Sequence, residues 1–153
     1  MVILDFGSQT TQLIARRVRE LGVFSEVVPG TTPAVAIAAR RPSALILSGS
    51  PASGYKNAAP LPDPGIYELK KPLLGICYGF QATMQRMGGE LKQASRAEYG
   101  MATFVQDGRS ALFANEQVLD CQSSVCTEIV PTTGESVTAG CWARHTATTY
   151  GPM

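Results

Sequence analysis

Short apolar runs alternate with segments of helical periodicity from the first residue to about residue 113. The first run covers residues 2–4, and Gly22 ends the helix that follows it. The apolar residues of that helix recur at helical spacing: Leu13, Ile14, Val18 and Leu21. A strand followed by a helix is the unit from which parallel sheets are built.

The same alternation continues to the middle of the chain. Residues 27–28 predict a second strand. Thr32 and Pro33 predict the N-cap and first position of a helix that continues through residues 34–40. Residues 44–47 predict a third strand. It runs into a loop of small residues, the 48–51 loop (Ser48-Gly49-Ser50-Pro51), which allows backbone amides to approach a ligand.

Five more elements are expected after that loop. Asp63 and Pro64 predict the start of a short helix, and residues 73–74 predict a strand. A helix is predicted over residues 80–87, ended by a pair of glycines. Two weaker strands are expected near residues 90–93 and 102–105.

This order predicts an α/β fold, with a mostly parallel sheet and helices on both of its faces. Ligands of such folds bind at the carboxyl ends of the strands. The 48–51 loop and Cys77 both fall at those ends. We therefore expect the functional site at these two segments.

Composition fits one soluble globular domain with a real core, since 44% of the 153 residues are apolar and 16% are charged. A net charge of +1 gives no electrostatic reason to expect nucleic acid or a membrane surface. Met1 leads directly into a strand rather than a signal peptide, and no apolar stretch is long enough for a membrane span. We expect a cytoplasmic protein with reduced thiols that acts on small molecules.

Cys77 stands between two glycines where a buried strand meets a helix. Gly75 and Gly79 occupy the −2 and +2 positions, where small residues allow a strained strand-to-helix turn, the nucleophile elbow, to close. The N-terminus of the following helix points its amides at the sulfur, which favours the nucleophilic thiolate. The alternative is that Cys77 is an ordinary buried small residue.

Three segments together resemble one family. They are Ile3-Leu4-Asp5-Phe6-Gly7-Ser8-Gln9, then Leu45-Ile46-Leu47-Ser48-Gly49-Ser50-Pro51, and the elbow around Cys77. The chain from Val2 to about Asn115 is similar in these segments to the class I (triad) glutamine amidotransferases. Within the family, the opening segment resembles the branch whose ammonia is used to aminate xanthosine monophosphate to GMP.

The resemblance implies a role for five residues. Cys77 would attack the side-chain amide of glutamine to give a thioester and ammonia, and water would then release glutamate. The backbone amides of Ser50 and Tyr78 would form the oxyanion hole. Gly49 and Gln81 would shape the pocket and hold the substrate. The family commonly has glycine where this chain has Ser50, but a main-chain donor survives that difference.

The resemblance also implies partners that this chain does not contain. The ammonia would pass to a synthetase domain or subunit that uses ATP, magnesium and xanthosine monophosphate. This sequence has no G-x-x-x-x-G-K-[ST] loop for ATP, so we expect no cofactor in the amidotransferase domain itself. No metal site is expected in that domain either.

The base expected for the thiol is missing from the sequence. The family carries it in a late His-x-Glu motif, but the single histidine, His145, is followed by Thr146 and Ala147, and no glutamate follows Glu135. We therefore divide the chain into a partial amidotransferase domain, residues 1–116, incomplete at its C-terminus, and a non-matching tail, residues 117–153. The simplest hypothesis is that this tail is out of frame or disordered, and we expect little or no glutaminase activity from this chain.

Three alternatives stay open from the sequence. The tail contains Cys121, Cys126, Cys141 and His145, whose spacing resembles a four-ligand zinc site. Alternatively, the chain is an inactive fragment that binds glutamine without turnover. A third alternative is an amidotransferase that supplies ammonia to another biosynthetic pathway.

Overall fold

A computed structural model describes residues 1–51, 60–105 and 118–130 of the chain. The chain forms two compact units, one built mainly by Met1–Leu91 and the other mainly by the chain from Lys92 onward. Among the helices that the structure describes, none is long and apolar enough to cross a membrane.

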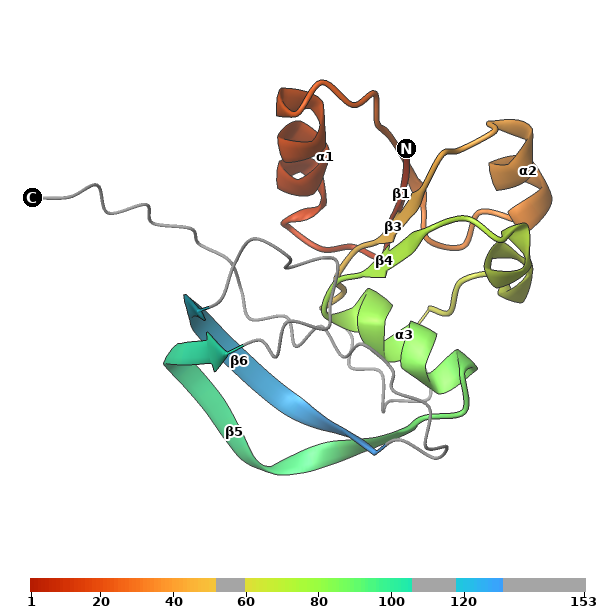
Figure 1. The fold of residues 1–153 in the computed structure, drawn as a ribbon. Coiled ribbons are helices and arrows are strands. Elements are labelled where there is room, and N and C mark those ends of the chain that lie inside the picture. Colours follow the sequence, from red (N-terminus) through yellow and green to blue (C-terminus); the bar gives the residue numbers. More distant parts are fainter. Residues whose placement is uncertain (52–59, 106–117, 131–153) are drawn as a thin grey trace, which may run out of the picture. The chain divides into compact units, whose positions relative to one another are not determined.

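The first unit is built on a parallel sheet of four strands in the order β2-β1-β3-β4 (Figure 1). The strands are β1 (Val2–Asp5), β2 (Glu26–Pro29), β3 (Leu45–Leu47) and β4 (Leu73–Gly75). The chain crosses from β1 to β2 and then back past β1 to β3, so two right-handed crossovers put their helices on opposite faces. The predicted α/β fold with a parallel sheet is confirmed.

Four helical segments connect these strands or follow them. They are α1 (Thr11–Glu20), α2 (Ala34–Ala39), the 3-10 helix η1 (Pro64–Leu69) and α3 (Tyr78–Arg86). Gly22, with a positive φ of 76°, ends the first crossover helix as predicted. The last helix starts two residues earlier than predicted, because the chain turns sharply at Cys77 and becomes helical at the next residue.

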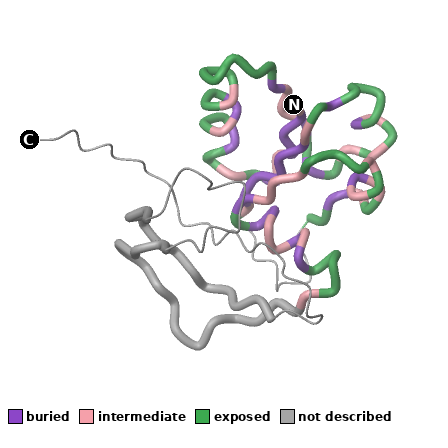
Figure 2. Tube along the Cα trace, in the orientation of Figure 1, coloured by how far each residue is buried: buried purple, intermediate pink, exposed green. Residues whose placement is uncertain are grey.

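The buried residues lie mainly on the strands and on the helix faces that cover them (Figure 2). Alternate residues of β1 point to opposite faces of the sheet, so Leu4 joins the main core cluster and Ile3 is buried outside it. At the carboxyl end of the sheet, the rings of Phe6 and Tyr78 meet edge to face with centroids 5.4 Å apart. This contact joins the end of β1 to the start of α3.

The inner face of α1 differs from the apolar stripe expected from the sequence. Leu13 and Leu21 are 46% and 82% exposed, whereas Thr11 and Ala15 are buried. Small residues at i and i+4 allow the helix to lie close to the sheet, and the two leucines lie outside that narrow contact. Ile14 and Val18 of the predicted stripe are half-buried, so spacing predicted the helix and part of its buried side.

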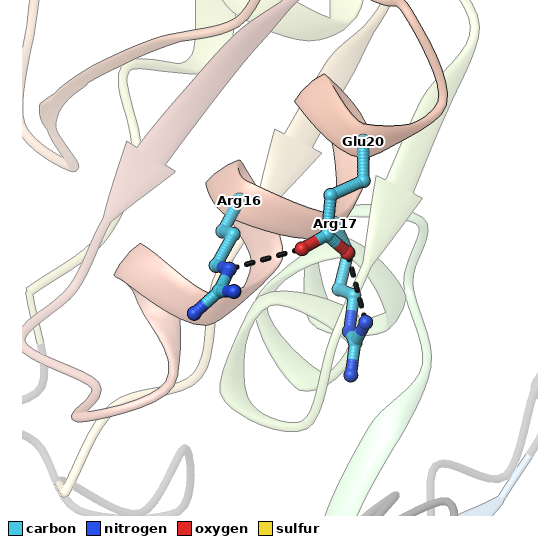
Figure 3. Close-up of polar contacts among 3 residues, drawn as sticks. All are labelled: Arg16, Arg17 and Glu20. Atoms are coloured by element: carbon cyan, nitrogen blue, oxygen red, sulfur yellow. Dashed lines mark hydrogen bonds and ion pairs between the residues drawn. The ribbon is translucent and has the colours of Figure 1, made fainter.

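The outer side of α1 carries two ion pairs that share one carboxylate (Figure 3). Arg16 Nε and Arg17 Nη1 donate to the two carboxylate oxygens of Glu20 at 2.9 and 2.8 Å. The hydrogen bond from Arg17, and then that from Arg16, lower the pKa of Glu20. Exposed pairs of this kind add little stability and weaken further in salt.

One carboxylate caps two helical segments. Asp63 Oδ2 accepts a hydrogen bond from the amide of Ala34, the first residue of α2, and Asp63 Oδ1 accepts one from the amide of Gly65 in η1. Both distances are 2.9 Å. The prediction that Thr32 caps α2 was wrong: Pro33 is the N-cap residue, and the distant Asp63 satisfies the helix amide. The hydroxyl of Thr32 donates instead to the carbonyl of Pro29.

The two hydrogen bonds to Asp63 give stability a defined pH dependence. The bond from Ala34, and then that from Gly65, lower the pKa of this carboxyl below its ordinary value of 3.8. A lowered pKa stabilises the fold above that value, and the contribution is lost as the pH falls. We expect Asp63→Asn to lower the free energy of unfolding at neutral pH, since one amide then faces an amide donor instead of an acceptor. As the pH falls from about 5 to about 3, the free energy of unfolding should decrease less in Asp63→Asn than in the unchanged chain.

Urea melts at several pH values measure this effect, and Glu20→Gln is the matched control. Glu20 also has a lowered pKa, but its partners are exposed cations, so added salt should reduce its contribution. The partners of Asp63 are neutral amides, so its contribution should survive salt. If the free energy of unfolding falls equally with pH in Asp63→Asn and in the unchanged chain, Asp63 is not the group whose lowered pKa stabilises the fold.

Most of a two-stranded sheet, formed by β5 (Glu90–Val105) and β6 (Val118–Val130), belongs to the second unit. The sequence predicted two short strands where β5 is one strand of 16 residues. Polar residues and Gly100 in its middle weaken the strand signal, which is why the two ends were predicted separately. No strand was predicted at β6, which lies beyond the boundary expected near residue 116.

Candidate active site

Cys77 occupies the sharp turn between β4 and α3. Its backbone has φ 52° and ψ −109°, a region that side-chain-bearing residues rarely adopt. Strain of this kind costs about 1–3 kcal/mol and persists where the surrounding structure enforces it, often at functional sites. Cys77 is exposed, so the alternative of a buried small residue is wrong. The expected elbow geometry is confirmed.

The two glycines beside the cysteine are required by close backbone contacts. A Cβ atom on Gly75 would lie 2.5 Å from the amide nitrogen of Phe80, and one on Gly79 would lie 2.3 Å from the carbonyl oxygen of Leu47. Each distance is far inside van der Waals contact, and the atoms met belong to the backbone. The elbow can therefore close only with glycine at both positions.

The first turn of α3 begins directly at the cysteine. Cys77 is the N-cap residue, its carbonyl accepts from the amide of Gln81 at 3.1 Å, and Tyr78 is the first helical residue. Amides of a first helical turn have no partner within the helix and favour negative charge nearby. The Tyr78 side chain is buried, and its hydroxyl donates to the carbonyl of Pro60. This buried ring anchors the start of α3.

The 48–51 loop lies beside the elbow. A Cβ atom on Gly49 would lie 3.6 Å from Cys77 Cβ and 3.3 Å from Ser8 Oγ. Gly49 therefore faces the candidate nucleophile on one side and the loop after β1 on the other. Ser50 follows Gly49 directly, so the two candidate oxyanion donors, the amides of Ser50 and Tyr78, belong to segments that meet at Cys77.

Two serines near Cys77 were not singled out from the sequence. Ser8 Oγ bonds to Thr10 Oγ1 at 2.7 Å and accepts from the amide of Thr10, which holds the loop after β1. Ser48 is fully buried, and its hydroxyl bridges the loop after β1 and the loop after β3. The available signal was their position, since each lies just beyond the carboxyl end of a parallel strand.

The general base and the zinc hypothesis lie beyond what the structure describes. His145, the single histidine, and Cys141 fall outside the described residues, and the side chains of Cys121 and Cys126 on β6 are not among those described. In the described part, no group of three or more His, Cys, Asp or Glu residues could hold a metal ion. The zinc site and the role of His145 stay predictions.

The fold and the elbow agree with the comparisons to known proteins. The family model of the class-I glutamine amidotransferases matches residues 2–139, and the chain belongs to that family. It is 51% identical over 107 residues to a glutamine-hydrolyzing GMP synthase of Chlorobium luteolum, which is 70% of this chain and 21% of the relative. It is 53% identical over 102 residues to the enzyme of that name from Thermus thermophilus, 67% of this chain and 20% of the relative. The chain thus aligns with about a fifth of the length of these relatives.

Solved structures support the same fold. A protein from Thermoplasma acidophilum, described as one of the subunits of a GMP synthase, aligns with a TM-score of 0.72 and 23% identity, over 87% of this chain and 67% of that one. A glutamine amidotransferase from Thermotoga maritima aligns with a TM-score of 0.62 and 16% identity, over 84% of this chain and 61% of that one. At these identities the likeness concerns the fold alone.

Proposed function

We propose that this chain is the amidotransferase part of a glutamine-hydrolysing GMP synthase, with Cys77 as its nucleophile. The observation that carries the proposal is the elbow, in which an exposed cysteine holds a strained backbone between two glycines that cannot be replaced without a clash. Family membership and about 50% identity to proteins named GMP synthase support the same function.

In the proposed reaction, a general base takes the thiol proton, the sulfur of Cys77 attacks the side-chain amide carbon (Cδ) of glutamine, and the electron pair of the C=O bond moves to oxygen. The amides of Tyr78 and Ser50 stabilise this oxyanion. When the carbonyl re-forms, the C–N bond breaks, and the protonated base gives its proton to the leaving nitrogen so that ammonia departs. Water then attacks the γ-glutamyl thioester, and the S–C bond breaks to release glutamate. Gly49 and Gln81 line the substrate pocket in this proposal.

The ammonia has a proposed destination outside this chain. A synthetase domain or subunit would use ATP with magnesium to activate xanthosine monophosphate, and ammonia would convert it to GMP. The amidotransferase domain needs no cofactor for its own steps, because a thiolate and backbone amides supply nucleophile and electrostatic stabilisation. A cytoplasmic location, where thiols stay reduced, is part of the same proposal.

A chloroketone analogue of glutamine tests the proposal, because its γ-carbonyl group directs an electrophile at the nucleophile. We expect it to alkylate Cys77, with chloride leaving and an S–C bond forming, and free glutamine to slow the reaction. Peptide mapping by mass spectrometry identifies the labelled residue. Cys121, Cys126 and Cys141 are the other thiols of the chain, and we expect the reagent to label Cys77 in preference to them.

Ammonia release from glutamine gives the second readout. We expect little or none from the chain alone, since no His-x-Glu motif accompanies Cys77. Labelling of the other cysteines at the same rate, or no protection by glutamine, would refute the proposed role of Cys77. Substantial ammonia release that depends on Cys77 would confirm the nucleophile and show instead that a base is present.

A further inference from the structure

The peptide between Gly49 and Ser50 must hold one orientation if the Ser50 amide is to stabilise an oxyanion. Such donors work because they are fixed in place before the reaction begins. Glycine restrains the backbone least of all residues, so Gly49 cannot supply that restraint itself. A neighbouring group has to do so.

The hydroxyl of Ser48 contacts this peptide directly. It donates a hydrogen bond to the carbonyl oxygen of Gly49 at 3.0 Å and accepts one from the amide of Phe6 at 3.1 Å. Both bonds are buried, and Ser48 itself has no exposed surface. Because no water competes for these bonds, they hold the hydroxyl in one orientation.

A planar peptide links the two ends of this contact. The carbonyl of Gly49 and the amide of Ser50 belong to the same trans peptide and point in opposite directions. A hydrogen bond that fixes the carbonyl oxygen therefore also fixes the direction of the amide. We propose that Ser48 is a positioning residue that orients the Ser50 amide as an oxyanion donor, an inference that rests on the proposed function.

The main chain of Ser48 also contacts the segment that carries the second proposed donor, the amide of Tyr78. Its carbonyl oxygen accepts a hydrogen bond at 3.1 Å from the amide of Gly79, the residue after Tyr78 in the first turn of α3. Phe6, whose amide binds the Ser48 hydroxyl, also packs its ring against the ring of Tyr78. Ser48 thus connects the two backbone segments that supply the proposed donors.

An aldehyde analogue of glutamine measures the oxyanion site without a completed reaction cycle. The sulfur of Cys77 adds to the aldehyde carbon of L-glutamate γ-semialdehyde, the C=O electron pair moves to oxygen, and that oxygen takes the proton lost by the thiol, so that a tetrahedral thiohemiacetal forms. With ¹³C at that carbon, NMR of the full chain reports the adduct and its dissociation constant. The probe also cyclises in water, but its open fraction is the same for every variant, so ratios of affinity are unaffected.

Ser48→Ala is expected to raise the dissociation constant of the adduct by about tenfold or more. In enzymes, loss of one oxyanion donor typically lowers kcat by a factor of roughly 10²–10³. The affinity for glutamine itself, measured by calorimetry, should change by less than about threefold, since the ground state carries no oxyanion. Ser48→Thr keeps a hydroxyl and should recover most of the adduct affinity. A purely structural role would weaken both ligands together.

Ser25→Ala is the matched control. Ser25 is also buried, and its hydroxyl donates to a backbone carbonyl, that of Ala15, near the amino end of the sheet. We expect Ser25→Ala to leave adduct affinity unchanged. If Ser48→Ala does not fold, Ser48→Cys keeps the shape with a weaker donor, and its adduct should still be weaker than that of the unchanged chain.

The outcomes separate the two proposals. If the unchanged chain forms no adduct at Cys77, the proposed function is wrong and this inference falls with it. If the unchanged chain forms the adduct and Ser48→Ala or Ser48→Cys forms it equally well, the function stands and the positioning role is wrong. Equal losses of adduct and glutamine affinity would likewise overturn the positioning role.

Discussion

Gly79→Ala is expected to unfold the first unit or to destabilise it by roughly 3 kcal/mol or more, because it overpacks a backbone contact. The new Cβ would lie 2.3 Å from the carbonyl oxygen of Leu47 and 2.5 Å from its Cβ. Alanine favours helices over glycine by about 1 kcal/mol, so on propensity alone the change would stabilise α3. The clash should outweigh that gain, since Leu47 lies on β3 between two paired strands and cannot move.

Urea denaturation measures the effect, with Gly22→Ala as the control. Gly22 also has a special backbone, with φ 76°, but a Cβ there would meet nothing within 4 Å. Its replacement should therefore cost only the conformational penalty of about 1 kcal/mol. If Gly79→Ala is as stable as the unchanged chain, α3 can move away from β3. The elbow would then not require glycine at this position.

Cys77→Gly is expected to abolish covalent reaction with glutamine analogues and at the same time to stabilise the fold. Glycine adopts φ 52°, ψ −109° without the penalty that a side chain incurs, which relieves about 1–3 kcal/mol of strain. The added freedom of glycine in the unfolded chain offsets roughly 0.5–1 kcal/mol of that gain. Cys77 is exposed, so little packing is lost.

Cys77→Ala separates the two effects. It removes the sulfur but keeps a Cβ at the same strained position, so it should lose all covalent labelling and gain no stability. We expect Cys77→Gly to exceed Cys77→Ala in free energy of unfolding by about 1 kcal/mol. Equal free energies of unfolding for the two variants would mean that the backbone at this turn relaxes once the thiol is removed.

The fold of the first unit could be predicted from the sequence because its signals are local. Apolar runs predicted the four strands of the first unit, and the glycines around Cys77 predicted the elbow. The cap of α2 could not be found in this way, since Asp63 lies 29 residues from Ala34 along the chain. The buried side of α1 was predicted only in part, because Ile14 and Val18 are half-buried, the leucines are exposed, and the small residues Thr11 and Ala15 are the fully buried ones.

The candidate site was predicted in part for a similar reason. Cys77 and the 48–51 loop carry motifs, so their position at the carboxyl ends of the strands followed from strand order. Ser48 and Ser8 carry no motif of their own, and their importance appears only when loops far apart in the sequence come together, as in the 42-residue separation between Phe6 and Ser48. The general base stays unassigned.

The shared cap at Asp63 makes two helical segments depend on each other. α2 has only six residues and η1 another six, too few for either to form alone in water. Both take an amide partner from one carboxylate, and Ile37 and Ile66 pack in the same core. When η1 opens, α2 loses its cap and part of its packing in the same event. We therefore expect α2 and η1, which lie on either side of β3 in the sequence, to open and close as one cooperative unit.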